Sequence, residues 1–336
     1  MDQETLLASL APEIQKIDSC MQAELANTGN PLLKEVVSHA IFNGGKRIRP
    51  LLTILASRLI ATRPAGAEAN NTDDNRLYQL ASIFEYLHAA SLLHDDVIDH
   101  AGQRRGKPSA NALWDNTIVI LAGDYLHTRA MTLAGTAGGT RCLEIIGAAT
   151  AAMISAEFLQ LQNLETINYS EENYYAVLQG KTASLIAAAC EVGVIHTGGD
   201  EPACQALRTY GANLGIAFQL VDDLLDYLGD AGKTGKKIGN DFQEGKLTLP
   251  LIHTLATADA RDQNFIMSLL NGDSKDRLTH FNAVRDLIQT NHGFDYTRKA
   301  AENLIEKAGT ALALFSKSSA RDMLTALTQY VLRRNK

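Results

Sequence analysis

The chain has 336 residues, of which 46% are hydrophobic and 21% are charged, a composition ordinary for a globular protein with a buried core. Its formal net charge of −7 argues against general nucleic-acid binding, which depends on a basic surface. No uninterrupted apolar run reaches the roughly 18 residues that a membrane span needs. The acidic residues Asp2 and Glu4 stand where a targeting signal would be basic. We therefore expect a cytoplasmic protein without a membrane span.

The cysteines show no pattern that points to chemistry. Cys20, Cys142, Cys190 and Cys204 form neither a CxxC pair nor a zinc-type spacing. We expect reduced structural thiols.

Nearly every long segment has the period of an α-helix, with apolar residues at three- and four-residue steps and few alternating β-branched runs. Helices are predicted over residues 3–25, 31–43, 50–62, 74–99, 112–132, 142–165, 171–197, 201–229, 248–257, 261–271, 276–290, 294–316 and 319–333. No linker rich in Pro, Gly or Ser divides the chain, and no repeat is visible. We predict one all-α domain over residues 1–336, a helical bundle with sites built between facing helices.

The first chemical candidate is the glycine-rich basic loop from Asn43 to Pro50. Two glycines free the backbone and three cations follow within four residues, namely Gly44, Gly45, Lys46, Arg47 and Arg49. These cations could grip a phosphate, with Arg in bidentate fashion. A solvated basic loop is an equally open interpretation of this segment alone.

Glu85 and His88 have the Glu-x-x-His spacing of di-iron carboxylate bundles. Such bundles need a second pair, which the sequence lacks, so this is a minor interpretation. His88 lies seven residues before Asp95, two helical turns along the same face. It either reaches the same cavity as Asp95 or packs as a core histidine.

Three aspartates then stand at positions i, i+1 and i+4, namely Asp95, Asp96 and Asp99. On one helical turn their charges repel, so a positive group should lie against them. A basic segment follows at once, with Arg104, Arg105 and Lys107. The apolar flank Leu92–Leu93 argues against a merely solvated acidic face. Carboxylates with Arg and Lys favour a hard cation such as Mg²⁺ bound together with a diphosphate.

The triplet Gly180, Lys181 and Thr182 is not a nucleotide-binding P-loop. That motif requires an earlier glycine and a preceding strand, whereas position 175 is Tyr and the context is helical. We interpret Lys181 and Thr182 as cavity-facing side chains beside a helix kink.

The aspartate spacing returns downstream, after Phe218 and Gln219, in Asp222, Asp223 and Asp226. Glycine-punctuated basic segments again follow, over residues 235–241 and 244–250, with Lys236 and Lys246. An acidic triad followed by a basic loop thus occurs twice, which is much stronger evidence than one occurrence. The two triads predict facing carboxylate clusters that share metal ions.

At this point the chain resembles the trans-isoprenyl diphosphate synthases, also called polyprenyl synthetases, over about residues 30–300. Both aspartate motifs fit, as do the segments at Gly44–Pro50, Lys181–Ala183, Gly235–Lys236 and Gly245–Pro250, in the family order. The resemblance implies an all-α isoprenoid-synthase bundle around a deep central cavity, a homodimer, and elongation of an allylic diphosphate primer with isopentenyl diphosphate.

The resemblance also implies roles for individual residues. About three Mg²⁺ ions would be held by Asp95, Asp96, Asp99, Asp222, Asp223 and Asp226. The allylic diphosphate would be bound by Arg104, Lys181, Lys236 and Lys246. Isopentenyl diphosphate would be bound by Lys46, Arg49, His88 and Arg105. Thr182 and Gln219 would face the developing cation, and with Lys181 they complete the catalytic group.

Product length in this family depends on the residues four and five places before the first Asp. These are the small residues Ser91 and Ala90, with Leu87 and Phe84 further along the same helix. Segment 111–126 also resembles long-chain synthases of the octaprenyl type, which make quinone side chains. We predict a product of six or more isoprene units, with geranylgeranyl or farnesyl diphosphate as the alternative.

Two rival functions are weaker. A class I terpene cyclase would carry an Asn/Ser/Glu pattern in the second motif, whereas this chain carries three Asp. A non-catalytic partner subunit would lose a triad or a basic loop, and none is lost. The run Tyr330–Arg334 either closes over a bound substrate or ends a helix, and the second interpretation is favoured. Product release by transient membrane contact is compatible with the absence of a predicted span.

Overall fold

The computed structural model describes residues 3–61, 74–229 and 238–334. The chain folds into two compact units, each made of segments that are distant in the sequence. Unit 1 holds Met1–Thr150, Leu185–Gly211 and Ala311–Ala326, and unit 2 holds Ala151–Ser184, Ala212–Thr310 and Leu327–Lys336. The single domain predicted for residues 1–336 therefore stays a prediction.

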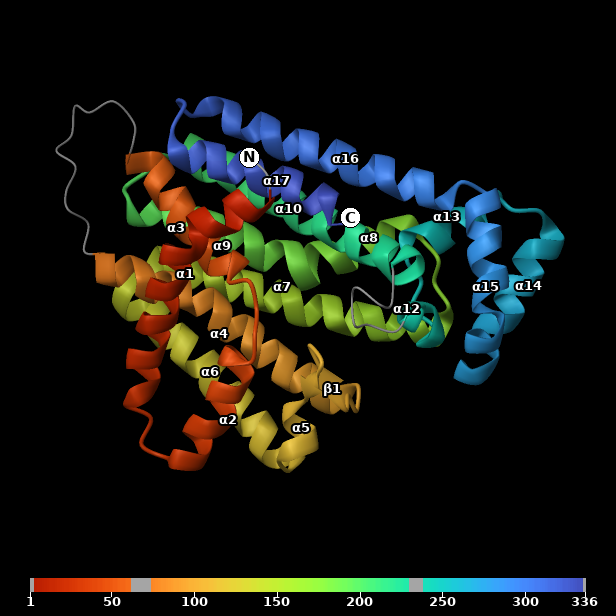
Figure 1. Cartoon of the computed structure of the whole chain (residues 1–336), viewed down its shortest axis with the longest axis horizontal. Helices are drawn as coiled ribbons and strands as arrows, with labels where there is room; N and C mark the ends of the chain where they lie inside the picture. Colours follow the sequence, from red (N-terminus) through yellow and green to blue (C-terminus); the bar gives the residue numbers. More distant parts are fainter. Residues whose placement is uncertain (1–2, 62–73, 230–237, 335–336) are drawn as a thin grey trace. The chain divides into compact units, whose positions relative to one another are not determined.

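The described residues are almost entirely helical, which confirms the all-α class (Figure 1). The α-helices are α1 (Gln3–Ala26), α2 (Pro31–Phe42), α3 (Ile48–Ala61), α4 (Asp74–Ile98), α5 (Ala110–Leu113), α6 (Asn116–Leu133), α7 (Gly139–Thr166), α8 (Glu171–Leu178), α9 (Ser184–His196), α10 (Glu201–Leu228), α12 (Asn240–Gln243), α13 (Leu249–Thr257), α14 (Ala260–Leu270), α15 (Ser274–Thr290), α16 (Gly293–Ala311) and α17 (Ser319–Arg333). Shorter elements are the π-helices η1 (Ala134–Gly138) and η2 (Gln179–Ala183) and the 3₁₀-helix η3 (Leu312–Leu314). Strand β1 (Gln103–Arg104) pairs antiparallel with β2 (Lys107–Pro108).

Helix α4 is the core of unit 1. It contacts α1, α3 and α6, and its side chains are buried on most sides, including Leu80, Phe84, Tyr86 and Leu87. A helix that is apolar nearly all round belongs in the interior of a protein. The first aspartate motif therefore stands at the end of a largely buried helix of this unit.

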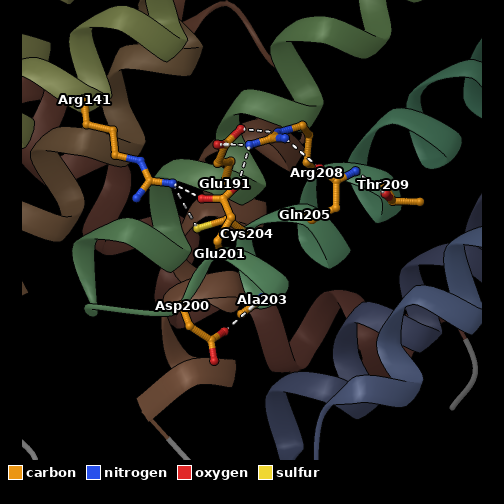
Figure 2. A network of polar contacts seen from close by, with 9 residues as sticks. All are labelled: Arg141, Glu191, Asp200, Glu201, Ala203, Cys204, Gln205, Arg208 and Thr209. Carbon is orange, nitrogen blue, oxygen red and sulfur yellow. Dashed lines mark hydrogen bonds and ion pairs between the residues drawn. The ribbon is translucent and has the colours of Figure 1, made fainter.

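A polar network links α7, α9 and α10 within unit 1 (Figure 2). Glu191 of α9 is only 4% exposed, and its carboxylate accepts a hydrogen bond from Nε of Arg208 at 2.7 Å and another from Nη2. Arg141 pairs with Glu201 at 2.5 Å. Because its ion pair satisfies it, the buried Glu191 carboxylate has a structural explanation and needs no ligand. All four cysteines of the chain are free thiols, as predicted.

In unit 2, an aromatic core anchors the C-terminal end of α10. Tyr227, at that end, stacks on Phe281 of α15 with ring centroids 5.8 Å apart, and Phe242 and Phe294 are buried in the same cluster. Gly239 has a φ of +81°, and a Cβ there would lie 2.6 Å from the Phe281 ring, so only glycine fits. This core fixes the helix end that carries the second aspartate motif.

Helix α7 also has an exposed apolar side. Ile154, Phe158 and Leu161 are 54%, 65% and 43% exposed. By length and composition alone, the helical run Asn116–Thr166 is apolar enough to cross a membrane, with a mean hydropathy of 1.6 over its most apolar stretch, of which 28% is buried. A helix outside a membrane has the same properties when its apolar side is covered by another protein surface.

Candidate active site

The first aspartate motif closes α4 in unit 1. The main-chain N–H of Asp99 donates to the carbonyl of Asp95 at 2.8 Å, so the helical turn continues through the motif. Asp96 is buried, and its Oδ1 lies 2.7 Å from both Nε and Nη2 of Arg104. Asn111 donates to the Asp96 carbonyl at 2.8 Å. The positive group expected beside this triad is therefore Arg104.

The β1–β2 hairpin brings two of the predicted basic segments together. Its turn is made by Arg105 and Gly106, whose φ angles are +54° and +74°. Nη1 of Arg105 donates to the carbonyl of Gly44 in the glycine loop. A Cβ on Gly45, whose φ is +123°, would lie 2.9 Å from that same nitrogen. Glycine at this position thus lets Arg105 dock on the loop.

A small pocket of about 30 Å³ lies beside the hairpin, room for about two water molecules. Its lining includes His39, Asn43, Leu93, Asp96, Arg104 and Arg105. Nε2 of His39 lies 3.1 Å from the Pro108 carbonyl, so α2 helps to hold the hairpin. The pocket thus joins the first aspartate motif to both basic segments.

Arg47 has a different place from the other cations of the glycine loop. It is 4% exposed and forms ion pairs with Asp18 and Glu85, each at 2.8 Å. Glu85 is therefore a partner of Arg47, which explains its position on α4 without a di-iron site. Arg47 fixes the loop and leaves Lys46 exposed beside it.

Arg49 and His88 share a positive environment in unit 1. Burial lowers the pKa of His88 well below 6.5, and the charges of Arg49, Arg105, Arg104 and Arg47 lower it further. His88 is therefore neutral near pH 7. Burial also lowers the pKa of Arg49, and its buried Nε has no hydrogen-bond partner. An unpaired guanidinium donor among other arginines is suited to an anion.

The predicted chain-length residues lie in the interior of unit 1. Phe84, Leu87 and Ala90 are buried in α4. Ser91 is half-buried, and its hydroxyl donates to the His88 carbonyl at 2.9 Å. These residues occupy the helix directly before the first motif, as their numbering requires.

The second aspartate motif gathers acids at the end of α10 in unit 2. Asp223 is buried, and the hydroxyl of Tyr174 donates to its Oδ2 at 2.5 Å. Burial raises the pKa of Asp223 well above 3.8, and the charges of Asp241, Asp222 and Asp226 raise it further. Asp241 and Tyr174 were not predicted as site residues. Asp241 belongs to α12, whose first main-chain N–H groups contact Asp226, and the spacing of residues along the sequence gives no sign of this long-range contact.

The other two aspartates of this motif also hold partners. The main-chain N–H groups of Asn240 and Asp241, at the start of α12, donate to the Asp226 carboxylate at 3.2 and 3.0 Å. Oδ1 of Asp222 lies 2.8 Å from Nη1 of Arg334.

The π-helix η2 sets the position of Lys181 and Thr182. The N–H of Ser184 donates to the carbonyl of Gln179, five residues back, which is the π pattern. A Cβ on Gly180 would lie 2.5 Å from Cβ of Ala156 and 2.7 Å from the carbonyl of Ala152, so this glycine lets η2 approach α7. The expected helix irregularity is therefore a π-bulge, and the segment is no P-loop.

The two side chains then face different helices of unit 2. Nζ of Lys181 lies 2.5 Å from Oε2 of Glu157 and 3.3 Å from Oε1 of Gln160, both on α7. The hydroxyl of Thr182 lies 3.4 Å from Oε1 of Gln219 on α10. Thr182 and Gln219 are thus brought together as a polar pair, next to the lysine.

The remaining predicted cations are Lys246 and Lys236. Lys246 pairs with Glu244 at 2.7 Å. Lys236 lies outside the described residues.

The chemistry of these residues fits a divalent cation. Within the described parts of the chain, no three His, Cys, Asp or Glu side chains converge tightly enough to enclose an ion. Burial is the main cause of the raised pKa of Asp223, and the charges of the neighbouring acids raise it further, so a positive ion at this cluster would be favourable. Clustered carboxylate oxygens without thiolate or imidazole are the ligands that Mg²⁺ prefers.

Comparisons with known proteins agree with this chemistry. A family model described as polyprenyl synthetase matches residues 30–288. The octaprenyl diphosphate synthase of Haemophilus influenzae is 36% identical over 324 residues, covering 96% of this chain and 94% of that protein. An all-trans-nonaprenyl-diphosphate synthase of Rhodobacter capsulatus is 33% identical, covering 98% and 97%.

Solved structures are also similar along the whole chain. A decaprenyl diphosphate synthase from Rhodobacter capsulatus superposes with a TM-score of 0.88 at 38% identity, covering 100% of both chains. A polyprenyl synthase from Caulobacter crescentus, solved with calcium and isoprenyl diphosphate, gives a TM-score of 0.87 at 34% identity, covering 99% and 98%.

Proposed function

Since the chain belongs to the polyprenyl synthetase family, we propose that it is a Mg²⁺-dependent, long-chain trans-polyprenyl diphosphate synthase. The chain is a prenyltransferase of the isoprenoid-synthase fold. The observation that carries the proposal is the repetition of one arrangement, an aspartate motif beside its own basic groups, once in each unit.

The six motif aspartates would hold Mg²⁺, about three ions in all, for binding of the allylic diphosphate; they are Asp95, Asp96, Asp99, Asp222, Asp223 and Asp226. When bound, the ions neutralise the negative charge that grows on the departing diphosphate. Arg104, Lys181 and Lys246 bind the remaining diphosphate oxygens, and Lys236 is assigned the same role by its place in the motif. The ion pairs of Arg104, Lys181 and Lys246 support this role, because each cation already lies beside acids that ligands would replace.

Isopentenyl diphosphate is bound in unit 1 by Lys46, Arg49, His88 and Arg105. The unpaired Nε of Arg49 and the docking of Arg105 on the glycine loop support this assignment. His88 is neutral, so it contributes as a hydrogen-bonding group and leaves the positive charge to the arginines.

The reaction forms one carbon–carbon bond and breaks one carbon–oxygen bond. As the allylic C–O bond breaks, the double bond of isopentenyl diphosphate attacks the cation, and a proton then leaves to the released diphosphate. Oxygen atoms of Thr182 and Gln219 face the cation, and an apolar cavity keeps water away from it. No separate His or Glu base is required.

A long product is favoured by the residues before the first motif. Ala90 and Ser91 are small, so growth is not stopped there, and Leu87 and Phe84 stand deeper in the helix. The relatives support this length, because their names include octaprenyl and nonaprenyl synthases. A short-chain synthase of Methanothermobacter thermautotrophicus is also 30% identical, so geranylgeranyl or farnesyl diphosphate is the alternative product.

We further propose a cytoplasmic homodimer. The exposed apolar stripe on α7, formed by Ile154, Phe158 and Leu161, supports a second copy as its partner. Burial of this stripe in a dimer accounts for the apolar run without a membrane span. A relative from Bacillus subtilis is named component 2 of a heptaprenyl diphosphate synthase, so a different partner subunit is the alternative outcome.

The proposal is tested by incubating the purified chain with farnesyl diphosphate and labelled isopentenyl diphosphate. Acid-labile product should form only with Mg²⁺. Asp96→Asn and Asp223→Asn should each lower turnover by about a hundredfold or more, whereas Asp286→Asn, an exposed acid on α15, should not. Incorporation without a divalent cation would contradict the proposal, and activity only after adding a second protein would favour the subunit alternative.

A further inference from the structure

Arg334, the residue directly after α17, lies on the second aspartate motif within unit 2. Its Nη1 is 2.8 Å from Oδ1 of Asp222, and its guanidinium carbon is 4.2 Å from the ring centroid of Phe218. The Arg334 side chain is only 19% exposed. The sequence favoured a simple helix end for this segment, so its placement on the motif is a finding of the structure.

The spacing of α10 explains why one guanidinium reaches both partners. Phe218 and Asp222 are four residues apart and therefore share a face of the helix. Arginine is suited to this position because its planar, charged group can stack on a ring while it forms an ion pair with a carboxylate at its edge. Two partners of different kinds thus fix Arg334 in one orientation.

The charge of Arg334 distinguishes it from the hydrogen-bond donors to this motif that are named above. The Tyr174 hydroxyl, which donates to Asp223, and the main-chain amides that donate to Asp226 are neutral. They can satisfy an oxygen but cannot offset the mutual repulsion of the acids. Arg334 brings a full positive charge to the carboxylate of Asp222 and so offsets the repulsion between the acids, as a bound metal ion would.

We infer that Arg334 is a built-in counter-ion of the second aspartate motif and lowers the affinity of this motif for Mg²⁺. The inference rests on the proposed function, in which Asp222 is a metal ligand. A divalent cation and Arg334 compete for the same carboxylate. Arg334 therefore stabilises the metal-free protein, and it weakens metal binding by the same factor.

The expected change in metal affinity is small because both side chains of the ion pair are partly solvated. Asp222 is 27% exposed, and ion pairs of this kind change equilibria by about fivefold at most. Removal of Arg334 should tighten metal binding by about twofold to fivefold. Such a shift is measurable, and it would set the Mg²⁺ concentration at which the second motif fills.

The experiment measures binding of Mn²⁺ to the full chain without substrate, by electron paramagnetic resonance of the free ion. The variants are Arg334→Ala, Arg334→Gln and Asp222→Asn, with Arg333→Ala as the matched control, because Arg333 is an exposed arginine at the same helix end. Thermal unfolding of each variant is recorded in EDTA and in saturating Mg²⁺. The use of two Arg334 substitutions keeps the test valid if one of them folds poorly.

We expect both Arg334 variants to bind Mn²⁺ more tightly than the wild type and to unfold at a lower temperature in EDTA. In saturating Mg²⁺ the difference in unfolding temperature should vanish, because the metal has displaced Arg334 in the wild type. The Arg333→Ala protein should behave as the wild type in every measurement. A destabilisation that persists at saturating Mg²⁺, with unchanged Mn²⁺ affinity, would show a purely structural residue and overturn the inference.

Asp222→Asn separates this inference from the proposed function. If Asp222→Asn weakens Mn²⁺ binding while the Arg334 variants bind as the wild type does, the metal site stands and the counter-ion role is wrong. If Asp222→Asn leaves Mn²⁺ binding unchanged, the assignment of Asp222 as a ligand fails, and the counter-ion role fails with it.

Discussion

Lys181 is held by an acid of the neighbouring helix, with its Nζ 2.5 Å from Oε2 of Glu157. Gln160, one helical turn further along α7, accepts from the same nitrogen at 3.3 Å. The close approach at Gly180 makes the contact possible, because any larger residue would push η2 away from α7. A lysine proposed to bind a diphosphate is thus already neutralised by Glu157.

Glu157→Gln should tighten binding of the allylic diphosphate by about twofold to fivefold, because it removes a negative charge beside the lysine while keeping a similar shape. The measurement is the dissociation constant of a non-hydrolysable allylic diphosphate analogue by calorimetry, in the presence of Mg²⁺. Glu165→Gln, an exposed acid further along α7, is the control and should change nothing. Weaker binding by Glu157→Gln would show instead that the acid holds Lys181 in its productive position.

Asp223→Asn should stabilise the metal-free protein by about 1–3 kcal/mol, because it removes a buried charge among other acids. The raised pKa means that the folded chain takes up a proton at Asp223 more readily than the unfolded chain. The contribution of this group therefore falls as pH rises from about 3.8 through the raised folded pKa. Urea unfolding in EDTA measures the gain, and the stabilisation that Mg²⁺ gives the wild type should shrink in the variant. A variant less stable than the wild type in EDTA would contradict this account.

His88→Gln should reduce the loss of stability in mild acid. The pKa of His88 is lowered in the folded chain, so below about pH 6.5 the unfolded chain binds a proton at His88 and the folded chain does not. The contribution of His88 to the free energy of unfolding is therefore complete above about pH 6.5 and is lost as the pH falls. Between pH 7.5 and 5.5 the wild type should lose about 1 kcal/mol more than His88→Gln, measured by urea unfolding. Equal losses would mean that the pKa of His88 is the same in the folded and unfolded chains, which would contradict the lowered pKa.

The helical period predicted most of this fold because apolar positions repeat wherever a helix packs on a core. The predicted helix 31–43 is α2, and 319–333 is α17 without change. Period alone could not show the π-bulges, since η1 and η2 interrupt the register by single residues. The predicted helix 171–197 is therefore α8, η2 and α9 in succession. The β1–β2 hairpin is too short to leave an alternating pattern.

The candidate site was predictable where a local motif carries it, and not where distant segments meet. The motifs that begin at Asp95 and Asp222 were predictable, because the aspartates of each motif are regularly spaced in the sequence. The sequence grouped Arg47 with its basic neighbours, and only its pairing with Glu85, 38 residues away, shows that it is structural. Arg334 contacts Asp222 although the two residues are more than a hundred positions apart in the sequence. The helical period predicts contacts within one helix and cannot predict such a long-range pair.

Phe158→Glu should convert the proposed dimer to a monomer. Phe158 is 65% exposed in the single chain, and a charge at this position would be buried without a partner in a dimer. Sedimentation velocity of the two proteins at the same concentration gives the mass. Glu172→Lys, a charge change at an exposed position of α8, is the control. A dimeric Phe158→Glu protein would place the interface elsewhere.

Ala90→Phe should shorten the product, because a phenyl ring one turn before Asp95 would block the path along α4 that a growing chain takes. Ala90 is only 4% exposed, so the added volume must enter the interior, and thermal unfolding is needed to show that the variant still folds. Reversed-phase chromatography of dephosphorylated products should show a shift from six or more isoprene units toward three or four. Phe84→Ala, two turns deeper, should have the opposite effect and lengthen the product, because Phe84 is fully buried where the path would end. If both variants fold and keep the wild-type product length, the residues that limit the length of the product do not lie on α4.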